Sequence, residues 1–252
     1  MRILVISDIH ANLAAFTAVL NRTREDRDLI LCLGDLVGYG PDPNECVELV
    51  AEVSTCILGG NHDLAAGGVI KAKAFSSHAK KSLRWTCSVL STVNTAYLSR
   101  LKPQFEYPNV PEPILLSHGG PEDPIWSYIF SEFDAEIAFR GASFSRCFFG
   151  HTHFPSVFMR NTGADVGPAL CTGHYGPPDM VVETSRLNAR LLLNPGSVGF
   201  PRNEEEAPSW DRRFHAVARY ALFDSKNGLW QFKGVEYNMG DTMERMVKFG
   251  LW

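Results

Sequence analysis

The sequence lacks several features that would mark other classes of protein. It has no C-x-x-C pair among its six cysteines, no apolar run near the ~20 residues that a bilayer-spanning helix needs, and a formal net charge of -4 in place of a basic excess. The apolar run Met1–Val5 is too short for a signal peptide. We therefore predict a cytoplasmic protein with reduced, mostly buried thiols, no membrane partner and no stable nucleic-acid partner.

Loops that bind nucleotide phosphates through glycine-rich backbone are missing too. Neither G-x-x-x-x-G-K-[ST] nor G-x-G-x-x-G occurs in the chain. No nucleotide cofactor is therefore expected, although a phosphate substrate is still possible, because bound metal ions would supply positive charge that the net charge omits.

Short apolar runs alternate with amphipathic stretches in the first 60 residues. The runs at 2–7, 29–33 and 55–58 are typical of buried strands, whereas 11–24 and 44–52 show helical spacing. This β-α-β-α-β order predicts parallel strands joined by helical crossovers.

The pattern changes after the third strand. Residues 71–101 look mainly helical, which predicts an insertion that either caps the site or packs beside it. Strands that end in motif residues are predicted at 114–117 and 147–149. Later strands, mostly antiparallel, are predicted at 156–160, 180–183, 190–193, 216–223 and 229–235, with a closing helix near 242–248. With no internal repeat or linker, we predict a single domain over residues 1–252, an α/β fold of two stacked sheets flanked by helices.

Five polar motifs each follow an apolar, strand-like run. They are Asp8-Ile9-His10, Gly34-Asp35, Gly60-Asn61-His62-Asp63, Ser117-His118-Gly119-Gly120 and Gly150-His151-Thr152-His153. Sites in open α/β sheets form beyond the carboxyl ends of the strands. We therefore expect the five motifs to meet at one edge of the fold.

The residue types in these motifs suit divalent metal ions. Carboxylates, imidazoles and an amide are ligands for Mn²⁺, Fe²⁺, Ni²⁺ or Zn²⁺, and the missing thiolate argues against structural zinc. The two side chains of D-x-H or H-x-H face the same way on extended backbone. Glycines before Asp35, Asn61 and His151 predict tight turns there. A single D-x-H is weak evidence, and we interpret the remaining histidines, His78, His174 and His215, as ordinary core or surface residues. His174, in a glycine-rich loop, is the one of the three that could approach the site.

The order D-x-H, G-D, G-N-H-[DE], H, G-H-x-H resembles the calcineurin-like metallophosphoesterase superfamily. The stretch Asn194–Gly199 is similar to a segment of its small bacterial and archaeal phosphoesterases. This resemblance implies a four-layer α/β-β/α sandwich of two mixed sheets. It also implies two divalent metal ions, the first bound by Asp8, His10 and His153, the second by Asn61, His118 and His151, with Asp35 bridging both.

The resemblance further implies a reaction and two catalytic residues. A metal-activated water would hydrolyse a phosphomonoester or phosphodiester, small nucleotides included, while His62 acts as general acid or transition-state donor. Asp63 would orient His62 through its other ring nitrogen. Asn12 and Arg202 are the predicted substrate contacts. Lys80, Lys81 and Arg84 could also bind phosphate, and Tyr39, Trp85 and Tyr175 could stack on a base, but a solvated surface and packing are the favoured interpretations.

The sequence bears on three alternatives to this interpretation. The metallo-β-lactamase fold is disfavoured because Phe154-Pro155 follow the H-x-H motif where that family has an Asp-His pair. Phosphoprotein phosphatase activity is disfavoured because Gly34–Gly40 does not match G-D-x-x-D-R-G. A non-catalytic scaffold of the same fold is the remaining alternative, although such a protein would usually have lost ligands that this chain retains.

Overall fold

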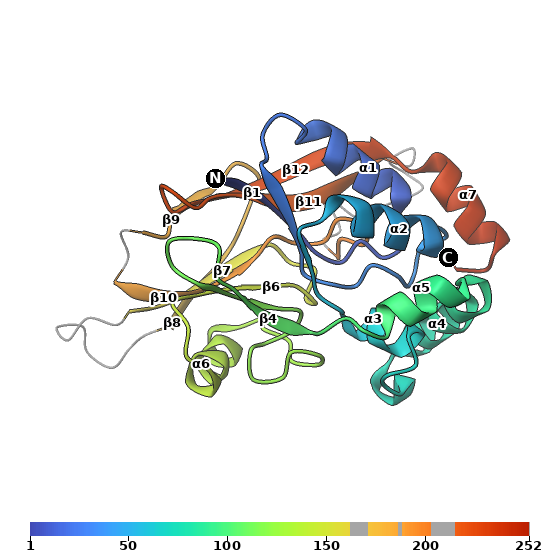
Figure 1. Cartoon of the computed structure of the whole chain (residues 1–252), viewed down its shortest axis with the longest axis horizontal. Helices are drawn as coiled ribbons and strands as arrows, with labels where there is room; N and C mark the ends of the chain where they lie inside the picture. Colours follow the sequence, from blue (N-terminus) through green and yellow to red (C-terminus); the bar gives the residue numbers. More distant parts are fainter. Residues whose placement is uncertain (162–170, 186–187, 203–214, 252) are drawn as a thin grey trace.

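Two stacked six-stranded sheets form the centre of the computed structural model, which describes residues 1–161, 171–185, 188–202 and 215–251 (Figure 1). The first sheet has the order β3 (Cys56–Ile57), β2 (Leu29–Cys32), β1 (Arg2–Ile6), β11 (His215–Asp224), β12 (Leu229–Asn238) and β9 (Val181–Glu183). The second has the order β4 (Gln104–Tyr107), β5 (Ile114–Ser117), β6 (Arg146–Phe149), β10 (Ala189–Asn194), β7 (Ser156–Asn161) and β8 (Cys171–Tyr175).

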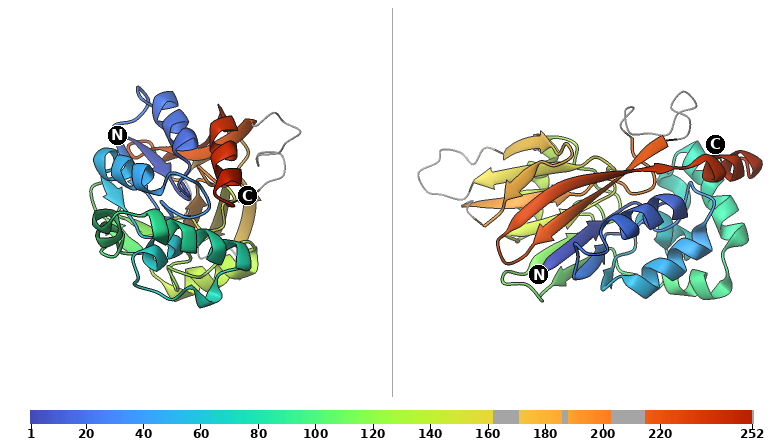
Figure 2. Two further views of the ribbon diagram at one scale, coloured as in Figure 1. Left: turned by 90° about the vertical axis from the view of Figure 1, so that its right-hand side faces the viewer. Right: turned by 90° about the horizontal axis from the view of Figure 1, so that it is seen from above.

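Helices complete the outer layers. α1 (Leu13–Arg22) and α2 (Pro43–Val53) cover the outer face of the first sheet, and α6 (Glu132–Gly141) covers that of the second. The others gather at one end of the sandwich, as Figures 1 and 2 show: α3 (Asn61–Ala66), the 3₁₀ turn η1 (Ala72–Ala74), α4 (Ser77–Val89), α5 (Thr92–Leu98) and α7 (Gly240–Lys248). The predicted four-layer α/β-β/α sandwich with two mixed sheets is confirmed.

The layers follow from the two-residue period of the strands. In β1, Ile3 and Val5 enter the core between the sheets, where Trp230 lies, whereas Leu4 and Ile6 face the core beneath the helices. Each face of β1 is thus fully buried, which explains its unbroken apolar run.

The strand directions place the site. β1, β2 and β3 are parallel, as predicted, and so are β5, β6 and β10. The prediction of antiparallel late strands holds for β7, β9, β11 and β12. It holds only in part for β10, which pairs antiparallel with β7 but in parallel with β6. β10 is inserted between two earlier strands, and local sequence does not encode that long-range choice.

Part of the segment 71–101 borders the candidate site, and part of it packs beside the site. η1 and the start of α4 reach the cavity described below, while α5 packs against α2 and α3. The six cysteines are free, and four of them are buried. None of the described helices is long and apolar enough to cross a membrane.

Candidate metal centre

The loops that follow β1, β2, β3, β5 and β6 meet at one edge of the sandwich. Backbone bonds join them directly: Asp8 N donates to Gly34 O at 3.0 Å, His10 N to Asp35 O at 2.9 Å, and Gly150 N to His118 O at 2.8 Å. The five motifs therefore converge as expected. Main-chain bonds join the loops after β1 and β2 and those after β5 and β6, and the Asp63 carboxylate joins the loop after β3 to the loop after β2.

Backbone strain is concentrated on the candidate ligands. Of the eight non-glycine residues with positive φ in the described chain, five are ligand candidates: Asp8, His10, Asp35, His151 and His153, with φ between 50° and 66°. The left-handed region costs an L-residue roughly 1–2 kcal/mol. Such strain is typical of functional sites, where the surrounding fold over-determines the conformation.

The candidate ligands form two groups that share Asp35. Asp8, His10, Asp35 and His153 make the first, and Asp35, His118 and His151 the second; within each, one ligand atom per residue lies within 4.8 Å of the others. In the first group, His10 Nε2 lies 3.1 Å from His153 Nε2 and 3.6 Å from Asp35 Oδ2.

The second group is completed by an amide. His118 Nε2 lies 3.6 Å from Asp35 Oδ2 and 3.2 Å from Asn61 Oδ1. All seven predicted ligands are therefore brought together, and Asp35 occupies the position between the two groups.

Backbone carbonyls fix the orientation of the imidazoles. Nδ1 of His10 lies 3.0 Å from Val37 O, and Nδ1 of His118 lies 2.9 Å from Leu33 O. His153 Nδ1 makes the same kind of bond to Phe200 O. Since a carbonyl accepts only from N–H, each Nδ1 donates and each Nε2 presents its lone pair to the centre.

The donor set fits divalent cations. Asp8 Oδ1 and His151 Nε2, one in each group, are buried atoms that have no hydrogen-bond partner. Burial raises the pKa of Asp8 to about 7 and holds the pKa values of His10, His151 and His153 well below their usual range. Without cations, burial of these carboxylates and imidazoles is uncompensated, and bound cations would supply both the partners and the opposing charge.

Glycines at the strand ends are needed for close approach as well as for the predicted turns. Only Gly34 among the three has a positive φ, +101°. A Cβ on Gly60 would lie 2.1 Å from Asp35 Oδ1, and one on Gly150 would lie 2.0 Å from Ser7 Oγ. At Gly60 and Gly150 close approach is a further reason for glycine. Gly150 also begins a tight turn, since its carbonyl O accepts from Thr152 N at 2.7 Å.

His62 stands beside the two groups and lines a cavity of about 390 Å³. Its ring packs at right angles to those of Phe75 and His10, with centroid distances of 4.8 and 5.0 Å. Its backbone N–H donates to Asp35 Oδ1 at 2.9 Å, which ties it to the residue shared by both groups.

Asp63 does not orient His62, so that prediction is wrong. Its Oδ1 accepts from Leu36 N at 2.8 Å and Val37 N at 3.1 Å, and its Oδ2 accepts from Gly60 N at 2.9 Å. His62 Nδ1 has no hydrogen-bond partner. The carboxylate instead holds the loop after Asp35 to the turn before Asn61.

Arg202 lines the same cavity and hydrogen-bonds to the side chains of Tyr39 and Tyr128. Burial, the larger effect, raises the pKa of Tyr39 to about 12, while Arg202 acts to lower it. This is the one predicted substrate contact that lies in the cavity. Lys80, Lys81 and Arg84 are absent from the described lining.

Asn12 has a structural role in place of the predicted substrate contact. It is 2% exposed, and its Oδ1 caps α1 by accepting from Ala15 N at 3.1 Å. Its Nδ2 donates to Gly199 O at 3.0 Å and Tyr237 Oη at 2.9 Å. The side chain is fully used in joining α1 to its neighbours.

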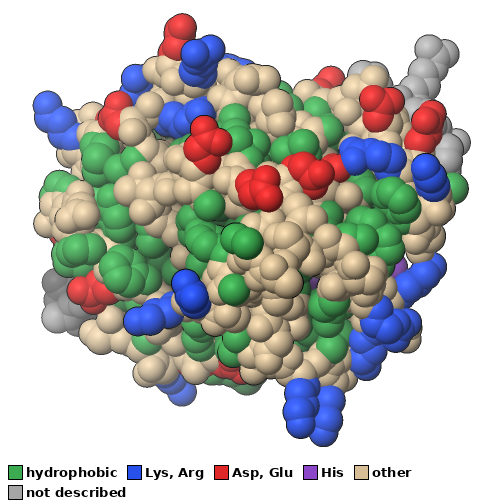
Figure 3. Space-filling view, turned by 45° about the vertical axis from the view of Figure 1, so that its right-hand side comes forward, with side chains coloured by type: hydrophobic (Ala, Val, Ile, Leu, Met, Phe, Trp, Pro, Cys, Tyr) green, Lys and Arg blue, Asp and Glu red, His purple; other side chains and the backbone are tan. Residues whose placement is uncertain are grey.

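Several residues of the site were not predicted. Ala74, Phe75, Trp126 and Tyr128 line the cavity, with Phe75 packed edge-on against Trp126 at 5.4 Å. Tyr39, considered for stacking on a base, instead stacks on Phe200 at 4.3 Å, and Trp85 stacks on Phe249. No local motif marks these residues, because they reach the site from loops without chemical signatures. Figure 3 shows little histidine on the face it presents, in keeping with the burial of the site.

The segment Asn194–Gly199 supports the metal centre from behind. Val198 N and Gly199 N each donate at 3.0 Å, to Ser7 O and Asp8 O, and Asn194 Nδ2 donates to Gly150 O at 2.9 Å. One segment thus braces the loops that carry Asp8 and His151.

The sequence and the fold match those of known proteins. A family model for calcineurin-like phosphoesterases matches residues 1–175. This chain belongs to the calcineurin-like phosphoesterase family. An uncharacterized protein of Methanocaldococcus jannaschii is 33% identical over 249 residues, which cover 98% of this chain and 92% of the relative.

Solved structures agree with the family over the whole chain. A metallophosphoesterase from Sphaerobacter thermophilus is 36% identical, with a TM-score of 0.80, and the match covers 100% of this chain and 95% of that one. A hypothetical protein from Pyrococcus horikoshii is 20% identical, with a TM-score of 0.73 and coverage of 100% and 94%, which shows the shared fold.

Proposed function

We propose that this calcineurin-like phosphoesterase hydrolyses phosphomonoester or phosphodiester bonds with two divalent metal ions. The observation that carries the proposal is the pair of buried ligand groups sharing Asp35, each with a buried ligand atom that lacks a partner. Retention of all seven ligand residues favours an enzyme over a scaffold.

Each ligand has a place in the proposed centre. Asp8, His10 and His153 would hold one ion, Asn61, His118 and His151 the other, and Asp35 both. When bound, such ions supply a nucleophile at neutral pH and neutralise phosphoryl charge. Mn²⁺, Fe²⁺, Ni²⁺ and Zn²⁺ all suit these ligands, and we favour Mn²⁺ for the first test.

Two further side chains would act on the substrate. His62 lines the cavity next to Asp35, so its imidazole is placed to donate a hydrogen bond or a proton to the leaving oxygen. Arg202, held by Tyr39 and Tyr128, would pair with a phosphoryl oxygen. Asp63 would act only by keeping the loops around His62 in place.

The proposed substrate is a small phosphoester, with a nucleotide favoured. A cavity of about 390 Å³ accommodates a phosphoryl group with one small substituent, and its aromatic lining suits an organic substituent. The free cysteines suit a reducing compartment, and a cytoplasmic location stays part of the proposal.

Replacement of His62 tests the proposed chemistry. His62→Ala should lower kcat for bis-p-nitrophenyl phosphate by roughly 10²–10⁴-fold, because a general acid contributes about that much. Metal content, measured by mass spectrometry, should stay near that of the unmodified protein.

His78→Ala is the matched control, since His78 lies near Tyr39 but is not part of the cavity lining and bonds to Leu251 O instead. It should leave kcat within about twofold, as a change outside the transition-state contacts does. Equal turnover in His62→Ala and the unmodified protein would rule out the role assigned to His62.

A further inference from the structure

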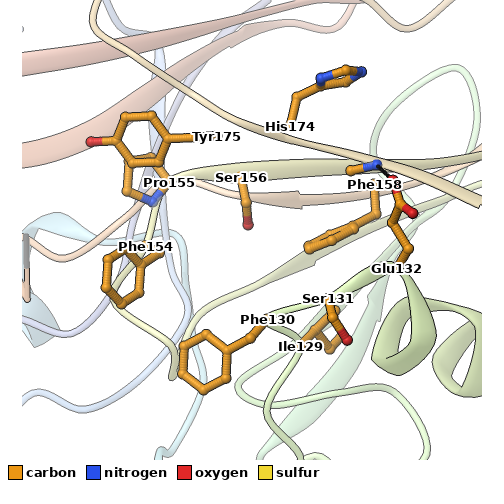
Figure 4. A pocket seen from close by; sticks show the side chains of 11 residues that line it. Ile129, Phe130, Ser131, Glu132, Phe154, Pro155, Ser156, Phe158, His174 and Tyr175 are labelled. Atoms are coloured by element: carbon orange, nitrogen blue, oxygen red, sulfur yellow. Dashed lines mark hydrogen bonds between the residues drawn. The ribbon is translucent and has the colours of Figure 1, made fainter.

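A second cavity of about 400 Å³ lies beside the metal centre, between the start of α6 and the adjoining parts of β7 and β8 (Figure 4). Its walls are Ile129, Phe130, Ser131, Glu132, Phe154, Pro155, Ser156, Phe158, Gly173, His174 and Tyr175. Neither the ligand groups nor the proposed reaction uses any of these side chains.

The lining suits a flat, uncharged ring. Four aromatic side chains surround the space, and the described lining contains no Lys or Arg, while Glu132 adds a negative charge. Gly173 pairs with Phe158 across the strands, and a Cβ there would lie 2.6 Å from the Phe158 ring. Glycine therefore leaves room for the Phe158 ring, which lines the cavity. The absence of Lys and Arg from the described lining makes the cavity unsuited to a second phosphate.

A row of aromatic rings joins this cavity to the metal centre. Tyr128 stacks on His151 with centroids 3.9 Å apart, and Phe130 stacks on Tyr128 at 5.4 Å and 8° between planes. Tyr128 lines the first cavity and Phe130 the second. Likewise, His153 lines the first cavity and its neighbour Phe154 lines the second. A substrate with its phosphate in the first cavity can thus reach the second along this row.

One polar atom in the second cavity lacks a partner. Ser156 is 8% exposed, and its Oγ is buried without a hydrogen bond. In Figure 4 this hydroxyl points into the space bounded by Phe154, Phe130 and Phe158. A buried hydroxyl normally finds a partner. A hydrocarbon ring offers none, whereas the ring nitrogens and exocyclic groups of a nucleobase do.

We propose that the second cavity is a subsite for the nucleobase of the substrate. This proposal rests on the proposed phosphoesterase function and narrows the substrate class to nucleotide esters. The base stacks on Phe130 and hydrogen-bonds to Ser156 Oγ, while the phosphate lies in the first cavity near Arg202.

The test compares two diesters with the same leaving group, adenosine 5′-(p-nitrophenyl phosphate) and methyl p-nitrophenyl phosphate, with Mn²⁺ present. The unmodified protein should show kcat/KM at least about fivefold higher for the nucleoside ester, as expected when one base stacks on an aromatic ring. Phe130→Ala and Ser156→Ala should each reduce that ratio, because kcat/KM should fall more for the nucleoside ester than for the methyl ester.

Phe133→Ala is the matched control. Phe133 is 75% exposed on α6 and lies outside the lining, whereas Phe130 is 53% exposed within it. The control should keep the full ratio. Neither Phe130, which is half exposed, nor the unpartnered hydroxyl of Ser156 is required for folding, and thermal unfolding of each variant checks this.

The possible outcomes distinguish failure of the subsite proposal from failure of the proposed phosphoesterase function. Turnover of both esters without preference, or a ratio unaffected by Phe130→Ala, would overturn the subsite and leave the phosphoesterase intact. If neither ester is hydrolysed, calorimetry with adenosine 5′-monophosphate decides: binding weakened by Phe130→Ala but not by Phe133→Ala supports the subsite, and no binding overturns it.

Discussion

Gly38 determines the space available to the His62 ring. Its φ is +92°, and a Cβ there would lie 2.3 Å from His62 Nδ1. Gly38→Ala should therefore displace His62 and lower kcat by about a hundredfold, in the range expected for a lost general acid. Steady-state kinetics with bis-p-nitrophenyl phosphate measure the effect.

Gly68→Ala separates this clash from backbone strain. Gly68 also has positive φ, +74°, but nothing lies within 4 Å of the position of its Cβ. Each variant should lose roughly 1–2 kcal/mol of unfolding free energy because it places alanine at positive φ. Gly38→Ala should lose more than Gly68→Ala, because its methyl group also collides with the His62 ring. A similar loss of kcat in both variants would show that the clash with His62 is unimportant.

Asp63 is predicted to act on stability. Asp63→Asn leaves one oxygen for three buried N–H donors, those of Leu36, Val37 and Gly60, so about 1–3 kcal/mol of unfolding free energy should be lost. Urea denaturation measures this loss. Unchanged stability together with a large fall in kcat would restore the orienting role that the sequence suggested.

At the scale of an element, Asn12 is predicted to stabilise helix α1 and its contacts with neighbouring segments. Asn12→Ala removes the cap of α1 and the bonds to Gly199 O and Tyr237 Oη. The cap alone contributes about 1 kcal/mol, and the two further bonds should bring the loss in unfolding free energy to about 2–3 kcal/mol.

Ser91→Ala provides the comparison, because Ser91 caps α5 through the single side-chain bond from Asn94 N. It should cost about 1 kcal/mol in the same denaturation experiment. If both variants lose equal stability, the additional bonds of Asn12 contribute nothing, and its substrate role would need to be reconsidered.

Elements with strong periodicity were predictable, and others were not. β1, β2, α1 and α2 lie within about two residues of their predicted bounds because apolar spacing alone defines them. α6 was missed because its Phe133 and Ile137 face solvent, which disturbs the helical pattern. β4 was missed because it is a short edge strand with two exposed residues.

The site shows the same division. The ligand set could be predicted because each ligand follows a strand whose end the fold places at one edge. The supporting contacts could not. Carbonyls such as Val37 O and Phe200 O leave no trace in residue type, and Asp63 was misjudged because its partners are backbone amides brought close only by the fold.

At the scale of the whole molecule, both sheets contribute ligands to one candidate metal centre. The first sheet supplies Asp8, His10 and Asp35, and the second supplies His118, His151 and His153. A metal centre with ligands from both sheets requires the two sheets to keep a fixed relative position. The apolar core that they share between them holds them in that position. This supports our proposal that residues 1–252 form a single domain.

The most direct test of the account is Mn²⁺-dependent hydrolysis by the metal-stripped protein, with bis-p-nitrophenyl phosphate and p-nitrophenyl phosphate compared side by side. We predict no turnover without metal, recovery as Mn²⁺ is restored to about two ions per chain, and loss of that recovery in Asp35→Asn, since Asp35 belongs to both ligand groups. The preferred compound then separates diesterase from monoesterase activity. Failure to take up Mn²⁺, together with no hydrolysis of either compound, would contradict the account and favour a non-catalytic scaffold.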